Sequence, residues 1–233
     1  MADYLQPDMG LENIGDAVRA AMLRVSDGFP YGGQWIFSGV QRSGKTLLLM
    51  HLVKQIVEQC PKVKIISNIS IFGVPCIPYT GPEMFDDPKY QFGKDGVIYI
   101  LDEIQTLYSS MESKNMPLSL IQVWSQSSKN RRLILGTTQR YSRAAKAVRE
   151  QTTFHYECRR PLMAVFYRYR VLDGANYNDE GQYIPPDGEE IPRFQFYVPS
   201  LSTMLMYNTL EVVKRPDEQP AKEEKKKNGY YHK

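Results

Sequence analysis

The sequence predicts an α/β protein with a mainly parallel central sheet flanked by helices, and with antiparallel late strands. Three observations favour this class. Apolar segments of strand length alternate with segments of helical periodicity, which is typical of strands joined by crossover helices. The third candidate strand is apolar along its whole length and the fourth is apolar in its middle, as expected for strands covered on both faces. A glycine-rich loop joins the first strand to the first long helix.

The N-terminal elements are predicted from periodicity and from the residues that interrupt it. Apolar residues at helical spacing indicate an amphipathic helix over 11–25, before a segment rich in glycine. Residues 34–39 form a short apolar strand. The helix that follows the glycine-rich loop is expected over 45–59, because Pro61 stands just beyond it.

The middle of the chain predicts further strands of the parallel sheet. Residues 62–70 are a second strand, 96–103 a third and 131–139 a fourth, with a helix over 117–130 before the fourth. Proline and glycine recur through 73–96, so we expect an irregular connection with one short helix there.

The C-terminal part predicts the late strands. Alternating patterns over 152–160 and 163–173 indicate two strands, and the acidic segment 174–193 indicates a loop. A last strand is expected over 194–200 and a short helix over 201–209.

Composition and charge divide the chain into three parts. We expect an N-terminal helix in 1–28, one domain over 29–212 and a charged, disordered tail over 213–233. The chain has a net charge of +3, and the tail from residue 214 accounts for all of it. In the body, lysine and arginine concentrate in 129–160, a pattern that favours polyanionic partners.

Several protein classes are disfavoured. Three cysteines without a C-x-x-C pair argue against a disulfide framework or a zinc site and fit a reducing cytoplasm. No apolar run approaches the roughly 18 residues of a membrane span, and the first ten residues do not resemble a signal peptide. The isolated histidines are expected to be structural or exposed: His51, His155 and His232.

The segment "GVQRSGKT" matches the G-x-x-x-x-G-K-[ST] motif, the Walker A pattern. Its glycines let backbone N–H groups surround phosphate oxygens, and the helix that follows directs its positive dipole end at the anion. Lys45 is expected to reach the β- and γ-phosphates, and Thr46 to offer its hydroxyl to Mg²⁺. The motif therefore predicts a RecA-like P-loop NTPase that binds ATP through these residues: Gly39, Val40, Gln41, Arg42, Ser43, Gly44, Lys45, Thr46 and Leu47.

Two acids follow the third predicted strand, at the position of a Walker B motif. A mononucleotide-binding fold needs a carboxylate there to hold Mg²⁺ through a water, and Asp102 fits this role. Glu103 is then placed to polarise the water that attacks the γ-phosphate. The pair favours ATP hydrolysis, and the absence of an N-K-x-D pattern weakens a GTPase interpretation.

Polar residues after the fourth strand are candidates for the remaining catalytic roles. Gln139 ends that strand, where α/β sheets place their ligands, and is interpreted as a sensor of the γ-phosphate. Arg143 and Arg149 are candidates for an arginine that acts on the site of a neighbouring subunit, with Arg131 and Arg132 as alternatives.

The late strands interleave aromatic and basic side chains. The favoured interpretation is an aromatic core face with a basic outer face, and a DNA-facing surface is the alternative. The residues concerned are Phe154, Tyr156, Phe166, Tyr167 and Tyr169 with Arg159, Arg160, Arg168 and Arg170.

Four segments, in their order and spacing, carry a family resemblance: "GVQRSGKT", "IISNI", "YILDEIQTLY" and "RRLILGTTQRYSRAAKAVRE". They resemble the zonula occludens toxin-like branch of the FtsK/HerA ATPases, and genome-packaging ATPases of tailless, internal-membrane phages, over about residues 30–172. The resemblance implies that Lys45 and Thr46 bind nucleotide, that Asp102 and Glu103 hold Mg²⁺ and the water, and that Gln139 senses the γ-phosphate.

The same resemblance implies a mode of action. Members of the family work as a ring, commonly a hexamer, that moves double-stranded DNA through its centre. Filamentous-phage assembly members carry a membrane-spanning helix after the ATPase domain, and this sequence shows none. We therefore expect a bacteriophage DNA-packaging motor in the host cytoplasm or associated with the virion, with a capsid-vertex or membrane protein as a further partner.

Other functions remain open at this point. One is a morphogenesis or secretion ATPase that acts on protein at a membrane through a separate anchor. Another is a structural or adaptor protein that nucleotide binding switches without rapid turnover. A small-molecule kinase is disfavoured, because the acidic segment 174–193 holds a single arginine, Arg193, and makes a poor lid.

Overall fold

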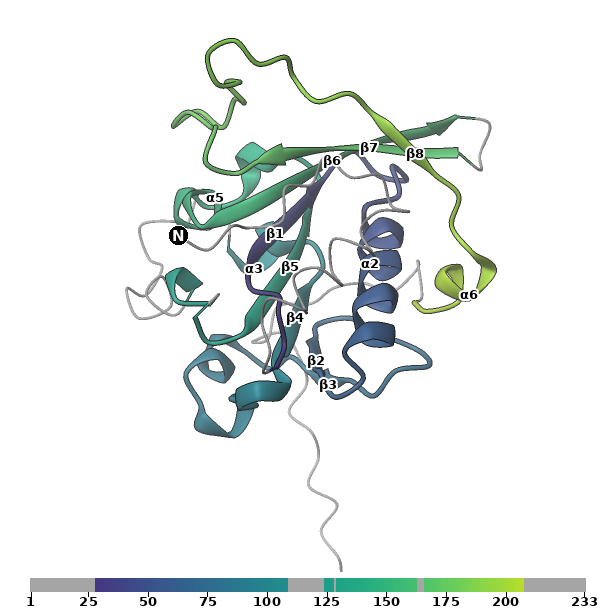
Figure 1. Cartoon of the computed structure of the whole chain (residues 1–233), viewed down its shortest axis with the longest axis vertical. Helices are drawn as coiled ribbons and strands as arrows, with labels where there is room; N and C mark the ends of the chain where they lie inside the picture. The colour runs from purple at the N-terminus through teal and green to yellow at the C-terminus, as the bar shows by residue number, and fades with distance from the viewer. Residues whose placement is uncertain (1–27, 109–123, 128, 163–165, 208–233) are drawn as a thin grey trace, which may run out of the picture.

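The computed structural model describes residues 28–108, 124–127, 129–162 and 166–207. Eight strands form one sheet in the order β3-β2-β4-β5-β1-β6-β7-β8 (Figure 1). The strands are β1 (Gly33–Ser38), β2 (Lys64–Ser67), β3 (Ile77–Pro78), β4 (Val97–Leu101), β5 (Arg132–Thr138), β6 (Thr152–Leu162), β7 (Phe166–Asp173) and β8 (Gln195–Tyr197). The described helices are α2 (Lys45–Gln59), α3 (Ile104–Leu107), α5 (Lys146–Glu150) and α6 (Leu201–Met204), with 3₁₀ turns η1 (Pro82–Phe85), η2 (Pro88–Tyr90), η3 (Gly93–Asp95) and η5 (Tyr141–Arg143).

The parallel part of the sheet places the site. β1 lies between β5 and β6 and is parallel to both, and β4 is parallel to β5 and β2. Ser38 pairs with Thr138, so β1 and β5 end side by side. Because parallel strands finish at one edge, the segments after β1, β4 and β5 meet there.

Helices cover both faces of the sheet (Figure 1). On the face of the sheet that α2 covers, an apolar cluster that includes Leu49, Ile98 and Leu135 is buried. The opposite side buries a second cluster, to which α3 contributes Ile104 and α5 contributes Val148. Every residue of β4 and β5 is buried, which explains why β4 and the middle of β5 are apolar in sequence.

The late strands complete the sheet in antiparallel fashion. β7 is antiparallel to β6 and to β8, whereas β6 itself is parallel to β1. Tyr156 and Tyr169 pack into the cluster on the α2 side. Arg159 and Arg168 are directly opposite each other in the β6–β7 ladder.

Two predicted strands need correction, and two elements were not predicted. The second strand is shorter than 62–70, because Asn68 leaves the ladder and binds the backbone of Asp102 with its side chain. The third strand ends at Leu101, so Asp102 and Glu103 follow it rather than belong to it. The structure adds α3, and a two-residue strand β3 that ends in a proline, neither of which periodicity can reveal.

Some predictions fall outside the described residues. They are the N-terminal helix over 11–25, most of the helix over 117–130 and the tail over 213–233. Of the helix over 117–130, Trp124 and Ser125 are helical, and the chain then turns toward β5. Within the described ranges, none of the helices has the length and apolar character needed to cross a membrane.

Candidate functional site

The phosphate loop, residues 39–46, joins β1 to α2 and is held by its own backbone. The Ser43 N–H donates to the Val40 carbonyl at 3.1 Å, and the Leu48 N–H donates to the Gly44 carbonyl at 2.8 Å. Among the residues that the structure describes, no side chain caps the first turn of α2. The first N–H groups of a 15-residue helix therefore remain available for an anion.

Gly44 is required at the start of α2. Its φ of 86° lies in the left-handed region, and a Cβ there would come within 2.4 Å of the Tyr167 ring. The Tyr197 hydroxyl donates to the Gly44 carbonyl at 3.3 Å. Strands β7 and β8 thus support the loop from the α2 side.

Two buried side chains of the loop have unmet bonding capacity. Lys45 is 7% exposed, and its ammonium donates to the Val40 carbonyl at 3.4 Å. The Ser43 hydroxyl is buried without a hydrogen-bond partner in the described part of the chain. Buried charges and polar groups normally have strong partners, so both side chains indicate a site built for an anion.

Asp102 joins the phosphate loop to the neighbouring strands. Its Oδ1 accepts from the Thr46 hydroxyl at 2.9 Å and from the Thr137 hydroxyl at 2.8 Å. The side chain of Asn68 brackets its backbone, accepting from the Asp102 N–H at 2.8 Å and donating to the Asp102 carbonyl at 2.9 Å. The carboxylate is therefore fixed beside Thr46.

Glu103 has a left-handed backbone, with φ of 50°, which is uncommon for a residue other than glycine and recurs at functional sites. Its N–H donates to the Thr137 hydroxyl at 2.9 Å, and its carbonyl accepts from the Thr106 hydroxyl at 2.8 Å. The Gln105 amide donates to its carboxylate. Thr137 thus contacts both acids.

The candidate sensor lies at the same edge. Gln139 directly follows β5, and the preceding carbonyl, that of Thr138, accepts from the Gly39 N–H at 3.2 Å. The Gln139 side-chain oxygen accepts from Nη1 of Arg143 at 3.3 Å. The exposed Arg143 thus lies beside Gln139.

The other candidate arginines are occupied within the chain. Both terminal nitrogens of Arg149 donate to the Asp179 carbonyl at 3.2 Å. Arg132 is 2% exposed and donates to the Phe85 carbonyl at 2.8 Å, and burial lowers the pKa of its guanidinium. A buried side chain does not reach a neighbouring subunit, so the structure removes Arg132 from the alternatives.

Thr46 and Asp102 fit an Mg²⁺ ion that is bound together with a nucleotide. They supply the hard oxygen donors that Mg²⁺ prefers, and they already converge. Among the described residues, three or more His, Cys, Asp or Glu side chains nowhere form a metal-binding group. Mg²⁺ is commonly held by one or two carboxylates together with substrate phosphates, so the two residues suit that mode.

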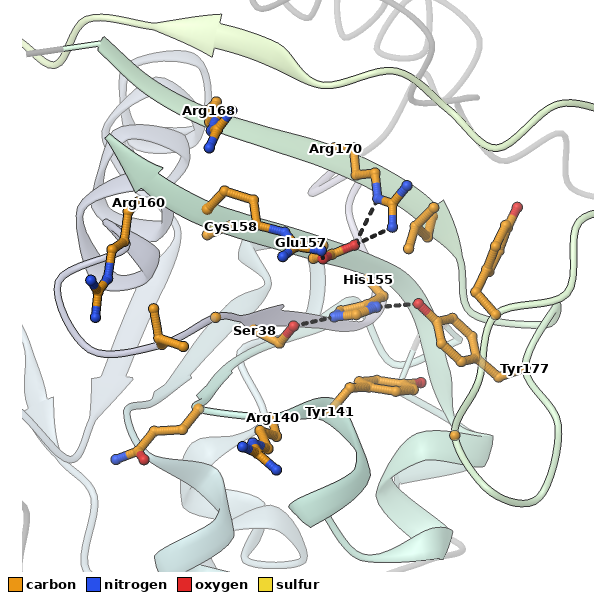
Figure 2. A pocket seen from close by; sticks show the side chains of 17 residues that line it. Ser38, Arg140, Tyr141, His155, Glu157, Cys158, Arg160, Arg168, Arg170 and Tyr177 are labelled. Carbon is orange, nitrogen blue, oxygen red and sulfur yellow. Dashed lines mark hydrogen bonds and ion pairs between the residues drawn. The ribbon is translucent and has the colours of Figure 1, made fainter. Parts of the chain in front are cut away.

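A second polar group lies on the other side of the phosphate loop (Figure 2). Nε2 of His155 lies 2.6 Å from the Ser38 hydroxyl, and Nδ1 bonds to the Tyr177 hydroxyl. The Tyr141 ring stacks on the imidazole with centroids 4.2 Å apart. Burial, and then the charge of Arg170, lowers the pKa of His155 to about 3. His155 is therefore a neutral, structural residue.

Two residues of the site were not predicted as functional: Asn68 and Thr137. Each is a polar residue at or just beyond the carboxyl end of an apolar strand. That position is the signal that could have identified them, since the carboxyl ends of neighbouring parallel strands meet at one edge.

Comparison with known proteins agrees with this fold. The family model of zonular occludens toxin (Zot) matches residues 74–183, which include Asp102, Glu103 and Gln139. The N-terminal domain of zonular occludens toxin from Neisseria meningitidis superposes with a TM-score of 0.55 at 14% identity, covering 76% of this chain and 98% of that chain.

A second solved structure is also similar. It is the genome packaging NTPase B204 from Sulfolobus turreted icosahedral virus 2 in complex with ATP-γ-S, with a TM-score of 0.51 at 10% identity, covering 72% of this chain and 98% of that chain. No curated protein sequence matches the chain. The predicted fold class and the resemblance to the zonula occludens toxin-like branch and to packaging ATPases are confirmed.

Proposed function

We propose that this protein hydrolyses ATP to translocate double-stranded DNA, as the motor that packages a viral genome. One observation carries the proposal: the carboxylate after β4 is hydrogen-bonded to the last residue of the phosphate-loop motif, Thr46, at 2.9 Å. Residues 56 positions apart in sequence therefore form one site. That site joins a phosphate-binding loop to an acid, as nucleotide hydrolysis requires.

The chain's own residues account for triphosphate binding. The backbone of residues 39–46 and the uncapped start of α2 bind the phosphates, and Lys45 neutralises charge on them. Thr46 and Asp102 hold Mg²⁺, which when bound offsets the negative charge of the β- and γ-phosphates. The buried Ser43 hydroxyl, which lacks a protein partner in the described ranges, donates to a phosphate oxygen.

Two further residues act on the attacking water. Glu103 accepts its proton and so acts as the general base. Its position is set by the bond from its backbone N–H to Thr137, which also holds Asp102. Gln139, beside Gly39, contacts the γ-phosphate and reports its loss to η5 through Arg143.

Similarity and charge support a DNA substrate and a ring. B204 is named a genome packaging NTPase, and the fold of this chain resembles it over 72% of its length. Basic side chains concentrate in 129–160 and in the C-terminal tail, which suits a phosphate backbone. We propose that several copies form a ring, in which Arg143 of one copy reaches the nucleotide of the next, and that the motor works in the host cytoplasm or on the virion.

The test is the rate of ATP hydrolysis by the purified chain with and without duplex DNA. We expect DNA to raise the rate several-fold, the chain to displace a third strand from a triplex in the presence of ATP, and Lys45→Ala to abolish both activities. Lys54→Ala is the matched control, because Lys54 lies on the exposed side of α2 and contacts Glu58 and Ser202.

Two results would contradict the proposal. One is hydrolysis that DNA does not alter, with no strand displacement, which would favour an ATPase acting on protein. The other is the absence of hydrolysis in a chain that binds ATP, which would favour a nucleotide-switched adaptor.

A further inference from the structure

A cleft of about 550 Å³ opens beside the phosphate loop. Its arginines come from the end of β5, from β6 and from β7, and we call it the arginine cleft: Arg140, Arg159, Arg160, Arg168 and Arg170. In the view of Figure 2, Arg168 lies above the hollow and Arg140 below it, with Arg160 at one side. Tyr156 and Tyr169 on the same two strands pack on the α2 side, so the cleft lies on the opposite face of the sheet.

Charge in the arginine cleft is unbalanced. Among the described residues of its lining, Glu157 is the single carboxylate, against five guanidinium groups. Oε2 of Glu157 accepts from Nε of Arg170 at 2.7 Å, and Oε1 lies 2.6 Å from Nη2 of Arg159. Both carboxylate oxygens are therefore already paired with an arginine. Within the described ranges, no carboxylate pairs with Arg140, Arg160 or Arg168.

The strand register brings like charges together. Arg159 and Arg168 are directly opposite each other in the antiparallel β6–β7 ladder, and like charges in that position are destabilising. Nε of Arg168 is buried, with no hydrogen-bond acceptor in the described part of the chain. A bound anion would relieve the repulsion and accept this bond.

We propose that the arginine cleft binds phosphate groups, as a second anion site distinct from the phosphate loop. Guanidinium groups match phosphate in geometry, because two parallel N–H groups meet two oxygens. The volume is within the range of about 300–1,000 Å³ that is typical of small-ligand sites. The site follows from charge and geometry alone and does not depend on ATP hydrolysis.

The location suggests two sources of phosphate. Gly39 and Val40 of the phosphate loop line the cleft together with Gln139, so inorganic phosphate released at the loop would lie close to the cleft. The cleft is also open to solvent near the exposed Arg160, where a phosphodiester of DNA can enter. Both sources present phosphate oxygens to the arginines, and the experiment below distinguishes between them.

The test measures phosphate and DNA binding by the full chain with the substitution Lys45→Ala, which weakens phosphate binding at the phosphate loop. Inorganic phosphate is titrated by calorimetry, and a short duplex DNA by fluorescence anisotropy at one fixed salt concentration. The cleft variants are Arg160→Gln, which alters an exposed side chain, and the double variant Arg159→Gln/Arg168→Gln. Arg193→Gln is the matched control, because Arg193 is an exposed arginine whose nearest acid is Glu190 at 4.0 Å.

We expect the double variant to bind at least one probe tenfold or more weakly, Arg160→Gln to bind it several-fold more weakly, and Arg193→Gln to match the parent. Arg168→Lys keeps the positive charge but loses the two parallel N–H donors of the guanidinium group. Its affinity for the probe should therefore lie between that of the parent and that of the double variant. Weaker binding of inorganic phosphate alone would identify the ligand of the cleft as the phosphate released by hydrolysis. Weaker binding of DNA would identify it as the DNA backbone. If Arg160→Gln and the folded double variant bind both probes as the parent does, the proposal is wrong.

Discussion

The two sides of the phosphate loop differ in how their polar groups are satisfied. On one side, Asp102 accepts two hydroxyl bonds, and Asn68 completes the bonding of its backbone. On the other side, the described residues place one carboxylate, Glu157, among five arginines, and it pairs with two of them, Arg159 and Arg170. The first side is ordered by the chain itself, whereas the second needs an anion to be complete. The difference separates a hydrogen-bonded group, for which we propose a catalytic role, from a surface whose charge requires a ligand.

Asp102→Asn is expected to have the largest effect on this comparison. The amide keeps the shape of the side chain and can still accept from Thr46 and Thr137, but it loses the charge that we propose for Mg²⁺ binding. We expect kcat for ATP hydrolysis to fall about 100-fold or more, with a small change in the free energy of unfolding. Steady-state kinetics and urea unfolding measure both quantities. Hydrolysis within threefold of wild type would contradict the assignment of Asp102.

Thr137→Val tests the hydrogen bonds around Asp102 and Glu103, and its expected effect is smaller. Removing the hydroxyl leaves the Glu103 N–H without its acceptor and takes one of two donors from Asp102. A buried donor left without a partner costs about 1–3 kcal/mol, so the free energy of unfolding should fall by that amount. Ser202→Ala removes a hydroxyl from an exposed position and should change stability by less than about 0.5 kcal/mol. Equal effects of the two substitutions would show that the Thr137 bridge contributes nothing.

The sequence predicted the elements around the phosphate loop well, because their signals are local. Helix α2 has the predicted bounds, 45–59, since the motif sets its start and Pro61 follows its end. The carboxyl ends of β1, β4 and β5 carry the expected polar residues. Thr137 and Asn68 were missed because their roles depend on which strands are neighbours, and strand order is not encoded in local periodicity.

The arginine cleft could not be predicted for a related reason. Arg159 and Arg168 become partners only through the register of β6 against β7. The sequence showed aromatic and basic residues interleaved, which favoured an aromatic core face with a basic outer face and left a DNA-facing surface as the alternative. The structure places Tyr156 and Tyr169 in the core and the arginines of the cleft on the other face, as the favoured interpretation predicts, whereas Phe166 is exposed.

His155 gives the smallest effect, a pH dependence that comes from the cleft side. Its pKa is lowered to about 3 by burial, so the folded protein stays neutral at this residue where the unfolded chain takes up a proton. Stability is therefore retained above the ordinary pKa of about 6.5 and falls as the pH decreases from there toward 3, by at most about 1.4 kcal/mol per pH unit. Urea unfolding at pH 7 and pH 5 measures the slope.

The control for this prediction is His155→Asn, which removes the titrating group. The variant should be less stable than wild type at pH 7, because it disturbs the bonds to Ser38 and Tyr177. Its stability should nevertheless change less between pH 7 and pH 5. A slope equal to that of wild type would mean that other groups cause the acid sensitivity.

The most direct test of the hydrolytic site compares wild type with Glu103→Gln in a single-turnover experiment, in which ATP binding is measured with a fluorescent analogue in the same samples. The account predicts equal binding and a hydrolysis rate that is about 100-fold lower or more in the variant, because Glu103 acts on the water and not on the phosphates. Hydrolysis by Glu103→Gln at the wild-type rate would contradict it.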